Sequence, residues 1–374
     1  MKLNTEMEWY QIKHSEELSS PALVVYPERV EHNIQEMLNI AGSADRLWPH
    51  VKTHKMGAII ALQKKQGITK FKCATTSEML LLAREGVDKI LLAHQPSTEK
   101  IKTLLSAQKK FSSTEFSTLC DNSDSLALFE QLSHEHQLKL SLWIDINNGM
   151  NRSGIVPEEA FELYSKIKSS PNLTFAGLHI YDGHIRDHDL NQRIANCQGH
   201  FKSVEALIAR IENEEQQAVK LITGGSPSFL PHALRQDNYL SPGTTLLWDL
   251  GYQKIWAESP FKQAALILTR LISKPAPSIY CFDLGHKALA SEMPMPRVSI
   301  IGFENAQHIG QSEEHLILKT ASPIDCKVGD LYYAIPVHIC PTVAKYNAAY
   351  VCSEHEIKEV WPIEARDYLI HPPL

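Results

Sequence analysis

Short apolar runs rich in β-branched residues alternate with amphipathic stretches over the first two thirds of the chain. One such stretch covers residues 78–84, where Met79, Leu80 and Ala83 share one side of the expected helix, and another covers 203–212. Strands that alternate with helices predict parallel pairing, because a parallel connection needs a crossover that usually contains a helix. The expected strands are residues 22–26, 47–52, 70–74, 90–94, 116–121, 138–146, 175–182, 220–223 and 238–247.

The number of these units predicts an α/β chain with a (β/α)8 barrel of the TIM type. When the first run is set aside, eight units remain, which is the count of such a barrel. A doubly wound open sheet also alternates strands and helices, but this many units in so short a span favours closure.

After about residue 256 the pattern changes to strands with turns rich in glycine and proline, which predicts a C-terminal all-β domain. We therefore expect a barrel over residues 21–255 and a β domain over 256–374. Residues 1–20 are expected to join the β domain, a placement that periodicity alone does not decide. The expected β-domain strands are residues 264–272, 279–284, 297–303, 315–320, 331–335 and 350–353.

Composition and charge limit the function classes. The net charge of −6 argues against a nucleic-acid partner, because phosphate binding needs a concentrated basic face. No stretch approaches the roughly 20 apolar residues that span a bilayer, and the polar N-terminus lacks the apolar core of a signal peptide. The seven cysteines are scattered without a Cys-x-x-Cys pair, as in a reduced protein. We therefore expect a soluble, cytoplasmic protein with neither nucleic acid nor membrane as a partner.

Polar residues follow the expected barrel strands at the ends where such barrels place their active sites. The loops after the last two strands combine glycine with hydroxyl side chains, at the position where these barrels bind phosphate. Glycines let the backbone approach an anion, while N–H groups and hydroxyls donate hydrogen bonds to it. Turns of this composition are also common without a ligand, so the prediction depends on the strand position. The candidate phosphate-binding residues are Thr223, Gly224, Gly225, Ser226, Ser241, Gly243 and Thr244.

Lys52 ends an expected barrel strand and would point into the barrel mouth. Partial desolvation and nearby cations there favour the neutral amine, which can attack an aldehyde. The alternative is a solvated lysine in a basic loop that also contains Lys55. Arg152 lies in a glycine-framed turn that would aim it back over the mouth. It could face a pyridine nitrogen and keep it unprotonated, or it could pair with a neighbouring carboxylate.

His338 and Cys340 lie in the expected β domain and, as residues i and i+2 of a strand, would share one face. An imidazole and a thiolate could then bind one ion, and nitrogen with sulfur ligation suits zinc. Pro341 would stop the strand and hold the pair at its edge. Two protein ligands would leave open positions for water or substrate. The alternative is that the two side chains only pack.

The segment 181–188 is dense in titratable side chains and follows the sixth barrel strand. Tyr181 and His184 are its candidates for acid–base catalysis, because a barrel places such groups at the ends of its strands. A hydrated polar loop is the alternative explanation of the same composition.

Several motifs occur in one order along nearly the whole chain. The two specific ones are Pro49-His50-Val51-Lys52-Thr53-His54-Lys55 and His338-Ile339-Cys340-Pro341-Thr342; between them stand Asn151-Arg152-Ser153-Gly154-Ile155, Thr223-Gly224-Gly225-Ser226-Pro227 and Ser241-Pro242-Gly243-Thr244. Together they resemble the fold-type III enzymes that use pyridoxal 5′-phosphate (PLP), and within them the alanine racemase-like D-threonine aldolase and D-serine dehydratase family.

The resemblance implies a role for each motif. Lys52 would be the Schiff-base lysine, with His50 and Tyr181 beside the cofactor and Arg152 near its pyridine nitrogen. The two glycine loops would hold the phosphate. A divalent metal on His338 and Cys340 would lie beside the β-hydroxyl of the substrate. The resemblance also implies a head-to-tail homodimer whose active sites combine the barrel of one subunit with the β domain of the other.

The metal motif separates two subgroups of this family. At the metal position D-threonine aldolases carry a motif similar to His-x-Asp, which favours a harder ion such as manganese. D-serine dehydratases carry a motif similar to His-x-Cys, together with zinc. Cys340 therefore favours the dehydratase and zinc, with manganese as the alternative ion.

We predict a PLP- and metal-dependent lyase that acts on a small β-hydroxy D-amino acid. A dehydratase would convert D-serine into pyruvate and ammonia, and an aldolase would convert D-threonine into glycine and acetaldehyde. An amino-acid racemase of the same fold is the nearest alternative, and it would need a second base and no metal. A PLP-carrying protein without robust turnover and a Schiff-base aldolase barrel without PLP are the others.

Overall fold

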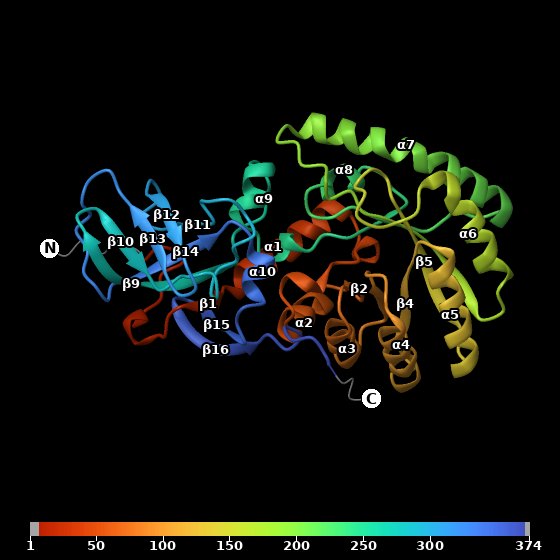
Figure 1. The fold of residues 1–374 in the computed structure, drawn as a ribbon, viewed down its shortest axis with the longest axis horizontal. Helices are drawn as coiled ribbons and strands as arrows, with labels where there is room; N and C mark the ends of the chain where they lie inside the picture. The colour runs from red at the N-terminus through yellow and green to blue at the C-terminus, as the bar shows by residue number, and fades with distance from the viewer. Residues whose placement is uncertain (1–6, 371–374) are drawn as a thin grey trace.

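Seven parallel strands stand side by side in their order along the chain, within residues 7–370, which the computed structural model describes. Isolated parallel bridges join residues 47–50 to both edges of this sheet, from Leu47 to Leu240 and from His50 to Lys72. The sheet therefore closes into the predicted α/β barrel, with residues 47–50 in place of a regular first strand (Figure 1). The strands are β2 (Lys70–Cys73), β3 (Lys89–Leu92), β4 (Glu115–Cys120), β5 (Leu140–Ile146), β6 (Leu173–Ile180), β7 (Leu221–Thr223) and β8 (Asn238–Leu240).

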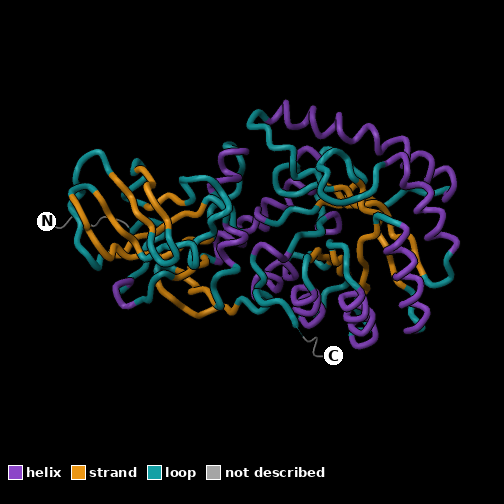
Figure 2. Tube along the Cα trace, viewed as in Figure 1, coloured by secondary structure: helices purple, strands orange, loops and turns teal. Residues whose placement is uncertain are grey.

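Helices cover the outside of the barrel, as the purple coils around the orange strands show in Figure 2. Their starts follow from the sequence: Thr75 and Asn122 accept backbone N–H groups at the starts of α3 and α5, and α1 and α6 begin with proline. The helices are α1 (Pro27–Ala41), α2 (Gly57–Lys65), α3 (Thr76–Arg84), α4 (Thr98–Lys110), α5 (Ser123–His136), α6 (Pro157–Ser169), α7 (Leu190–Glu215) and α8 (Phe229–Ala233).

The inside and the outside of the barrel are packed by alternate residues of each strand. Outward residues pack against the helices in one large core, and a smaller cluster with two tryptophans, Trp48 and Trp143, fills the interior. Toward the C-terminal ends of the strands the interior becomes polar, because the inward residues there include Lys72 on β2, Asp145 on β5 and His179 on β6. This polar layer forms the floor of the site described below.

The β domain is a nine-stranded sheet within the described part of the chain. Strand β1 (Ala22–Val25) lies inside this sheet, where it pairs antiparallel with β9 and parallel with β15. The first apolar run therefore belongs to the β sheet, although the sequence placed it within the barrel range 21–255. The remaining strands are β9 (Ala265–Ala276), β10 (Ile279–Phe282), β11 (Val298–Ile300), β12 (Gln307–Gln311), β13 (Leu316–Lys319), β14 (Leu331–Pro336), β15 (Ala348–Ser353) and β16 (Glu356–Pro362).

Two short helices, α9 (Leu250–Ile255) and α10 (Ile339–Val343), lie between the barrel and the β domain (Figure 1). The predicted strand at His338 and Cys340 is wrong, because His338 is the N-cap of α10 and Cys340 lies in its first turn. Pro341 is tolerated there, since the first turn of a helix needs no N–H donor at that position. The buried carboxylate of Asp249 accepts the N–H of Ile339 at 3.0 Å and so helps to start the helix.

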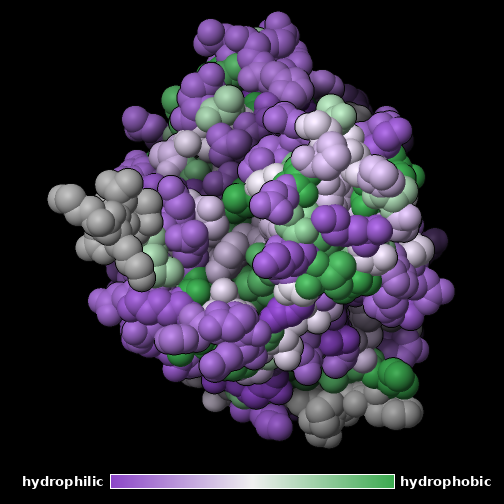
Figure 3. All heavy atoms as spheres, turned by 90° about the vertical axis from the view of Figure 1, so that its left-hand side faces the viewer, coloured by the Kyte–Doolittle hydropathy of each residue, from purple (hydrophilic) through white to green (hydrophobic). Residues whose placement is uncertain are grey.

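The surface of the β-domain end is largely hydrophilic, with apolar side chains in small separate groups (Figure 3). Among the described residues, Ile309, Val328 and Val360 are large apolar side chains of this domain that are exposed. None of the described helices combines the length and the apolar character needed to cross a membrane.

Candidate active site

A cavity of about 350 Å³ opens at the C-terminal ends of the barrel strands. Four of the residues that the sequence singled out, His50, Lys52, Arg152 and Tyr181, line it. The cavity combines several cationic side chains with one carboxylate, that of Asp145, so it suits an anionic ligand.

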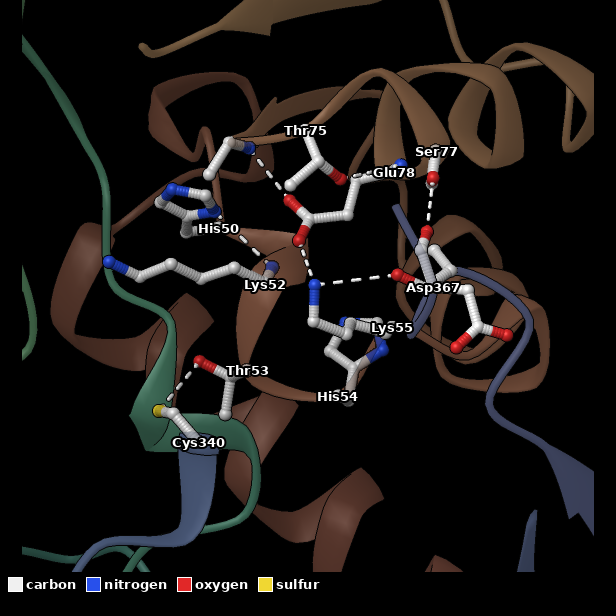
Figure 4. Close-up of polar contacts among 12 residues, drawn as sticks. His50, Lys52, Thr53, His54, Lys55, Thr75, Ser77, Glu78, Cys340 and Asp367 are labelled. Carbon is white, nitrogen blue, oxygen red and sulfur yellow. Dashed lines mark hydrogen bonds and ion pairs between the residues drawn. The ribbon is translucent and has the colours of Figure 1, made fainter. Parts of the chain in front are cut away.

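Lys52 lies in a short 3-10 turn, Val51–Thr53, that directly follows the bridge at His50. The imidazole Nδ1 of His50 caps this turn by accepting the N–H of Lys52 at 3.3 Å. Burial, followed by the charges of Lys52 and Lys72, lowers the pKa of His50 well below its usual value, so its ring is a neutral acceptor. The Lys52 side chain is free to extend along the cavity (Figure 4).

The second lysine of the motif, Lys55, is held away from the cavity. Its ammonium group pairs with the carboxylate of Glu78, a side chain that is fully buried. The other carboxylate oxygen of Glu78 accepts the N–H of Ala74 at 2.7 Å (Figure 4). The pair thus joins the turn that contains Lys52 to the end of β2, and it distinguishes the structural Lys55 from the available Lys52.

Lys72 is a buried lysine in the same cavity, and the sequence analysis did not select it. Its Nζ lies 3.2 Å from Nε2 of His179, whose Nδ1 lies 2.7 Å from a carboxylate oxygen of Asp145. Gln95 and Ser153 donate to the other Asp145 oxygen at 2.8 and 3.0 Å. The K-F-K-C pattern of β2, with apolar residues on the outward face, was the signal that a lysine points inward here.

Burial, then the charge of Lys52, lowers the pKa of Lys72 to about 7, although Asp145 opposes the shift. Burial and the Lys72 charge also lower the pKa of His179, so this ring is neutral. Burial opposes ionisation of Asp145, but the hydrogen bonds from its partners outweigh it and lower the pKa of the carboxyl group. Asp145 is therefore the fixed negative end of the chain of groups.

Arg152 lies across the ring of Tyr181, with its guanidinium carbon 4.7 Å from the ring centroid. The turn that contains Arg152 is closed at Gly154, which has φ +97° and whose added Cβ would lie 2.6 Å from the backbone N of Asn147. The N–H of Gly154 donates to Asp121 at 2.9 Å. Only glycine fits this position without strain, and the turn aims Arg152 over the cavity as expected.

The two glycine loops meet through Ser226, whose hydroxyl oxygen accepts the N–H groups of Gly243 at 3.2 Å and Thr244 at 3.0 Å. Ser241 lies in the same place, with a buried hydroxyl that has no partner among the described residues. An added Cβ on Gly225 would lie 2.8 Å from the Tyr181 ring. Because the Ser226 oxygen accepts both N–H groups, its own O–H remains to donate, and together with the unsatisfied Ser241 hydroxyl it fits a bound phosphate group. Another member of the predicted set, Thr223, donates instead to the carbonyl of Tyr239.

A buried group of polar side chains supports the first glycine loop from behind. Asp182 accepts hydrogen bonds from Ser228 at 2.5 Å and from the His232 ring at 2.6 Å. The Ser228 hydroxyl in turn accepts the N–H of Gly225 at 3.2 Å. Burial opposes ionisation of Asp182, but the charge and the hydrogen bond of His232 lower the pKa of this carboxyl group. The Ser228 hydroxyl thus links the backbone of Gly225 to the buried Asp182 carboxylate.

His338 and Cys340 come together at the start of α10, even though no strand holds them. The thiol of Cys340 lies 3.4 Å from the Thr53 hydroxyl (Figure 4). It also lies 3.3 Å from the Thr244 hydroxyl. Burial raises the pKa of the Cys340 thiol, but the neighbouring His338 outweighs burial and lowers it. A nitrogen and a thiolate donor so arranged fit zinc.

This contact lies within one chain. The β domain brings its own His338 and Cys340 to its own barrel, beside the turn of Lys52 and the second glycine loop. Glu292 accepts from Nδ1 of His338 at 2.5 Å, which leaves Nε2 for an ion. Glu292 could not be recognised from the sequence, because it lies in an irregular loop far from the motif.

His184 is placed elsewhere. Its ring packs edge-on against His200 of α7, with the centroids 4.9 Å apart, and it is not among the residues that line the cavity. Burial, then the charge of His200, lowers the pKa of His184. Its predicted partner Tyr181, by contrast, forms part of the cavity wall.

A parallel barrel with a lysine-lined mouth and hydroxyl-rich glycine loops fits the class of proteins that hold a phosphate-bearing aldehyde cofactor. Residues 25–250 match the family model of the alanine racemase N-terminal domain, and residues 264–352 match that of the putative serine dehydratase domain. The chain belongs to the alanine racemase N-terminal domain family, a PLP-dependent family.

Relatives span nearly the whole chain. The 3-hydroxy-D-aspartate aldolase of Paracoccus denitrificans is 25% identical and the D-threonine aldolase of Arthrobacter sp. 23% identical, each over 94% of this chain and 92% and 93% of the relative. The crystal structure of D-threonine aldolase from Filomicrobium marinum superposes with a TM-score of 0.85 at 23% identity, over 94% of this chain and 96% of that one. The D-threo-3-hydroxyaspartate dehydratase of Delftia sp. HT23 follows with a TM-score of 0.79 at 18% identity, covering 94% and 98%.

Proposed function

We propose that this protein is a PLP- and metal-dependent lyase that acts on β-hydroxy D-amino acids. The observation that supports it is that the candidate metal pair and the candidate cofactor site lie in contact within one chain. Cys340 contacts the hydroxyl of Thr53, the residue directly after Lys52, and the hydroxyl of Thr244 in the predicted phosphate loop. The names of the relatives, which include aldolases and a dehydratase of hydroxy-D-amino acids, agree with this proposal.

In this proposal Lys52 would hold the cofactor through its Nζ atom. The Lys52 amine would also be the base that accepts the proton from the α-carbon of the substrate. Arg152 and Tyr181 would line the wall of the cofactor cavity, and the hydroxyl groups of Ser226 and Ser241 in the glycine loops would hold the phosphate. PLP, when bound, supplies the electron sink for the charge that develops on the α-carbon.

His338 and Cys340 would hold the metal ion, which would supply a Lewis acid at the β-hydroxyl oxygen. Glu292 orients His338 through its Nδ1, and Asp249 fixes the backbone between the two ligands. The proposed ion is zinc, because the donor set is one nitrogen and one sulfur. The dimer remains part of the proposal, with the partner contributing residues other than this metal pair.

Dehydration of a D-serine-type substrate is the proposed reaction, because Cys340 follows the His-x-Cys pattern of the dehydratases. Aldol cleavage is the second candidate, since aldolases align over almost the whole chain. A racemase of the same fold would not need the histidine–thiolate pair, so it is the weaker alternative.

The test is a product assay of the zinc- and PLP-loaded protein with D-serine, D-threonine and 3-hydroxy-D-aspartate. We expect pyruvate and ammonia from D-serine, and loss of activity in Lys52→Ala and His338→Ala. If the products are glycine and an aldehyde, with no oxo acid, the proposed dehydratase activity is wrong and the protein is an aldolase. Racemisation that is insensitive to a chelator would overturn the lyase. Borohydride reduction followed by peptide mapping should place the cofactor on Lys52.

A further inference from the structure

Lys72 is a cationic side chain of the cavity to which the proposed function assigns no role. Its residue is buried, and it lines the same cavity as Lys52. No carboxylate within the described residues forms a direct ion pair with it, because Asp145 is reached only through His179. A buried cation without its own counter-ion is costly, so such a group usually serves a ligand.

The direction of the hydrogen bonds leaves donors on Lys72 unused. Asp145 accepts from Nδ1 of His179, so the proton of the neutral ring is on Nδ1 and its Nε2 is an acceptor. Lys72 therefore donates one of its three N–H groups to His179. The remaining N–H groups are available to whatever occupies the cavity.

The charges around Lys72 come from several elements. Two cations, Lys52 and Arg152, and two neutral imidazoles, His50 and His179, face Lys72. The carboxylates of Asp145 and Asp182 oppose the effect of the cations on its pKa. Burial with these cations lowers the pKa of Lys72 to about 7. An anion that enters the cavity would restore the charge on Lys72, because an opposite charge favours the protonated amine.

The order of the elements around the barrel indicates which anion this is. The phosphate loops follow β7 and β8, Lys52 follows residues 47–50, and Lys72 stands on the next strand, β2. PLP carries its phosphate arm, its aldehyde and its phenolate oxygen on three consecutive ring carbons. The order of these three groups around the ring matches the order around the barrel of the phosphate loops, Lys52 and Lys72.

We propose that Lys72 is a positioning residue that donates a hydrogen bond to the phenolate oxygen of PLP, beside the link to Lys52. His179 and Asp145 hold the Lys72 ammonium group in place. The proposal rests on the function proposed above, since it requires PLP in this cavity. A positive charge at this oxygen opposes protonation of the nearby nitrogen of the Lys52–PLP link.

The test compares Lys72→Met and Lys72→Gln with the control Lys70→Met. Lys70 lies two residues earlier on the same face of β2, over the ring of Tyr239 at 5.2 Å and bonded to Asp45, away from the cavity. Each variant is reconstituted with PLP, its fold is checked by circular dichroism, and the visible band of the Lys52–PLP link is titrated with pH. PLP affinity is measured by equilibrium dialysis.

In both Lys72 variants we expect the midpoint of the band to rise by about one pH unit, because a neighbouring positive charge has been lost. PLP affinity should fall by about tenfold in Lys72→Met and by less in Lys72→Gln, which keeps a donor. Lys70→Met should behave as the wild type. Unchanged midpoints in both Lys72 variants, or an equal rise in Lys70→Met, would overturn the role of Lys72. Absence of the band in the wild type would instead refute the proposed function itself.

Discussion

Replacement of Glu78 by glutamine removes the charge that holds the turn of Lys52 against the end of β2. The carboxylate is fully buried, and its two oxygens serve the Lys55 ammonium group and the N–H of Ala74. Glutamine keeps the shape but has one acceptor oxygen, so either Lys55 or Ala74 loses its partner. Lys55 then remains as a largely buried charge without compensation.

Breaking a buried pair in this way costs about 3 kcal/mol or more. For a domain of this size, a loss of about 3 kcal/mol lowers the melting temperature by about 6–12 °C. The assay is thermal unfolding of the protein without PLP, followed by circular dichroism. The double variant Glu78→Gln with Lys55→Met should melt higher than Glu78→Gln, because it no longer buries an unpaired ammonium group.

The control is Glu162→Gln, which removes the exposed pair with Lys166 on the surface of α6. Its melting temperature should equal that of the wild type, since exposed pairs contribute little. Equal melting temperatures of Glu78→Gln and the wild type would refute this role of the Lys55–Glu78 pair. A double variant whose melting temperature falls by the sum of the decreases in the two single variants would refute it as well.

Three further outcomes are expected. Gly225→Ala should weaken PLP binding at least tenfold in equilibrium dialysis, because the new methyl group meets the Tyr181 ring, whereas Gly199→Ala, with open space around it, should bind normally. Without PLP, the free energy of unfolding of the wild type relative to Lys72→Met should rise from pH 7 toward pH 10 by up to about 1.4 kcal/mol per unit. The difference in free energy of unfolding rises because Lys72 in the unfolded chain keeps its proton in that pH range, while in the folded protein, with its pKa lowered to about 7, it has lost the proton. Urea unfolding of both proteins at several pH values measures this difference, and a difference that is constant with pH would contradict the prediction. Cys340→Asp should exchange zinc for manganese when metal content is measured by mass spectrometry, and unchanged zinc binding would exclude the thiolate as a ligand.

The barrel was predictable because its strands are short and apolar and its helices are amphipathic, and both patterns are local. The predicted segment 47–52 shows the limit of this. It contains only isolated bridges, since Pro49 has no N–H to donate and the chain turns at once into Val51–Thr53. The placement of Lys52 at the barrel mouth did not depend on that detail, so the candidate lysine could be found from the sequence.

The floor of the site could not be predicted, because it is assembled by closure of the barrel. Lys72, Asp145 and His179 come from β2, β5 and β6, and nothing in the spacing of these residues indicates that their side chains meet. The candidate metal pair was singled out by a sequence motif and not by its geometry. A motif indicated His338 and Cys340, while the strand assumed for them is in fact a helix that a distant carboxylate, Asp249, helps to start.

The place of β1 determines how the polypeptide is assembled as it is synthesised. This strand leaves the ribosome before the entire barrel, but its partners β9 and β15 follow after it. The barrel is therefore an insertion between the first and second strands of the β sheet. A fragment that ends after the barrel would keep β1 without partners, and a fragment that begins at β9 would lack the strand that joins it to β15. Each would expose an open strand edge that favours aggregation, so the two parts are expected to be obtained intact only from one continuous chain.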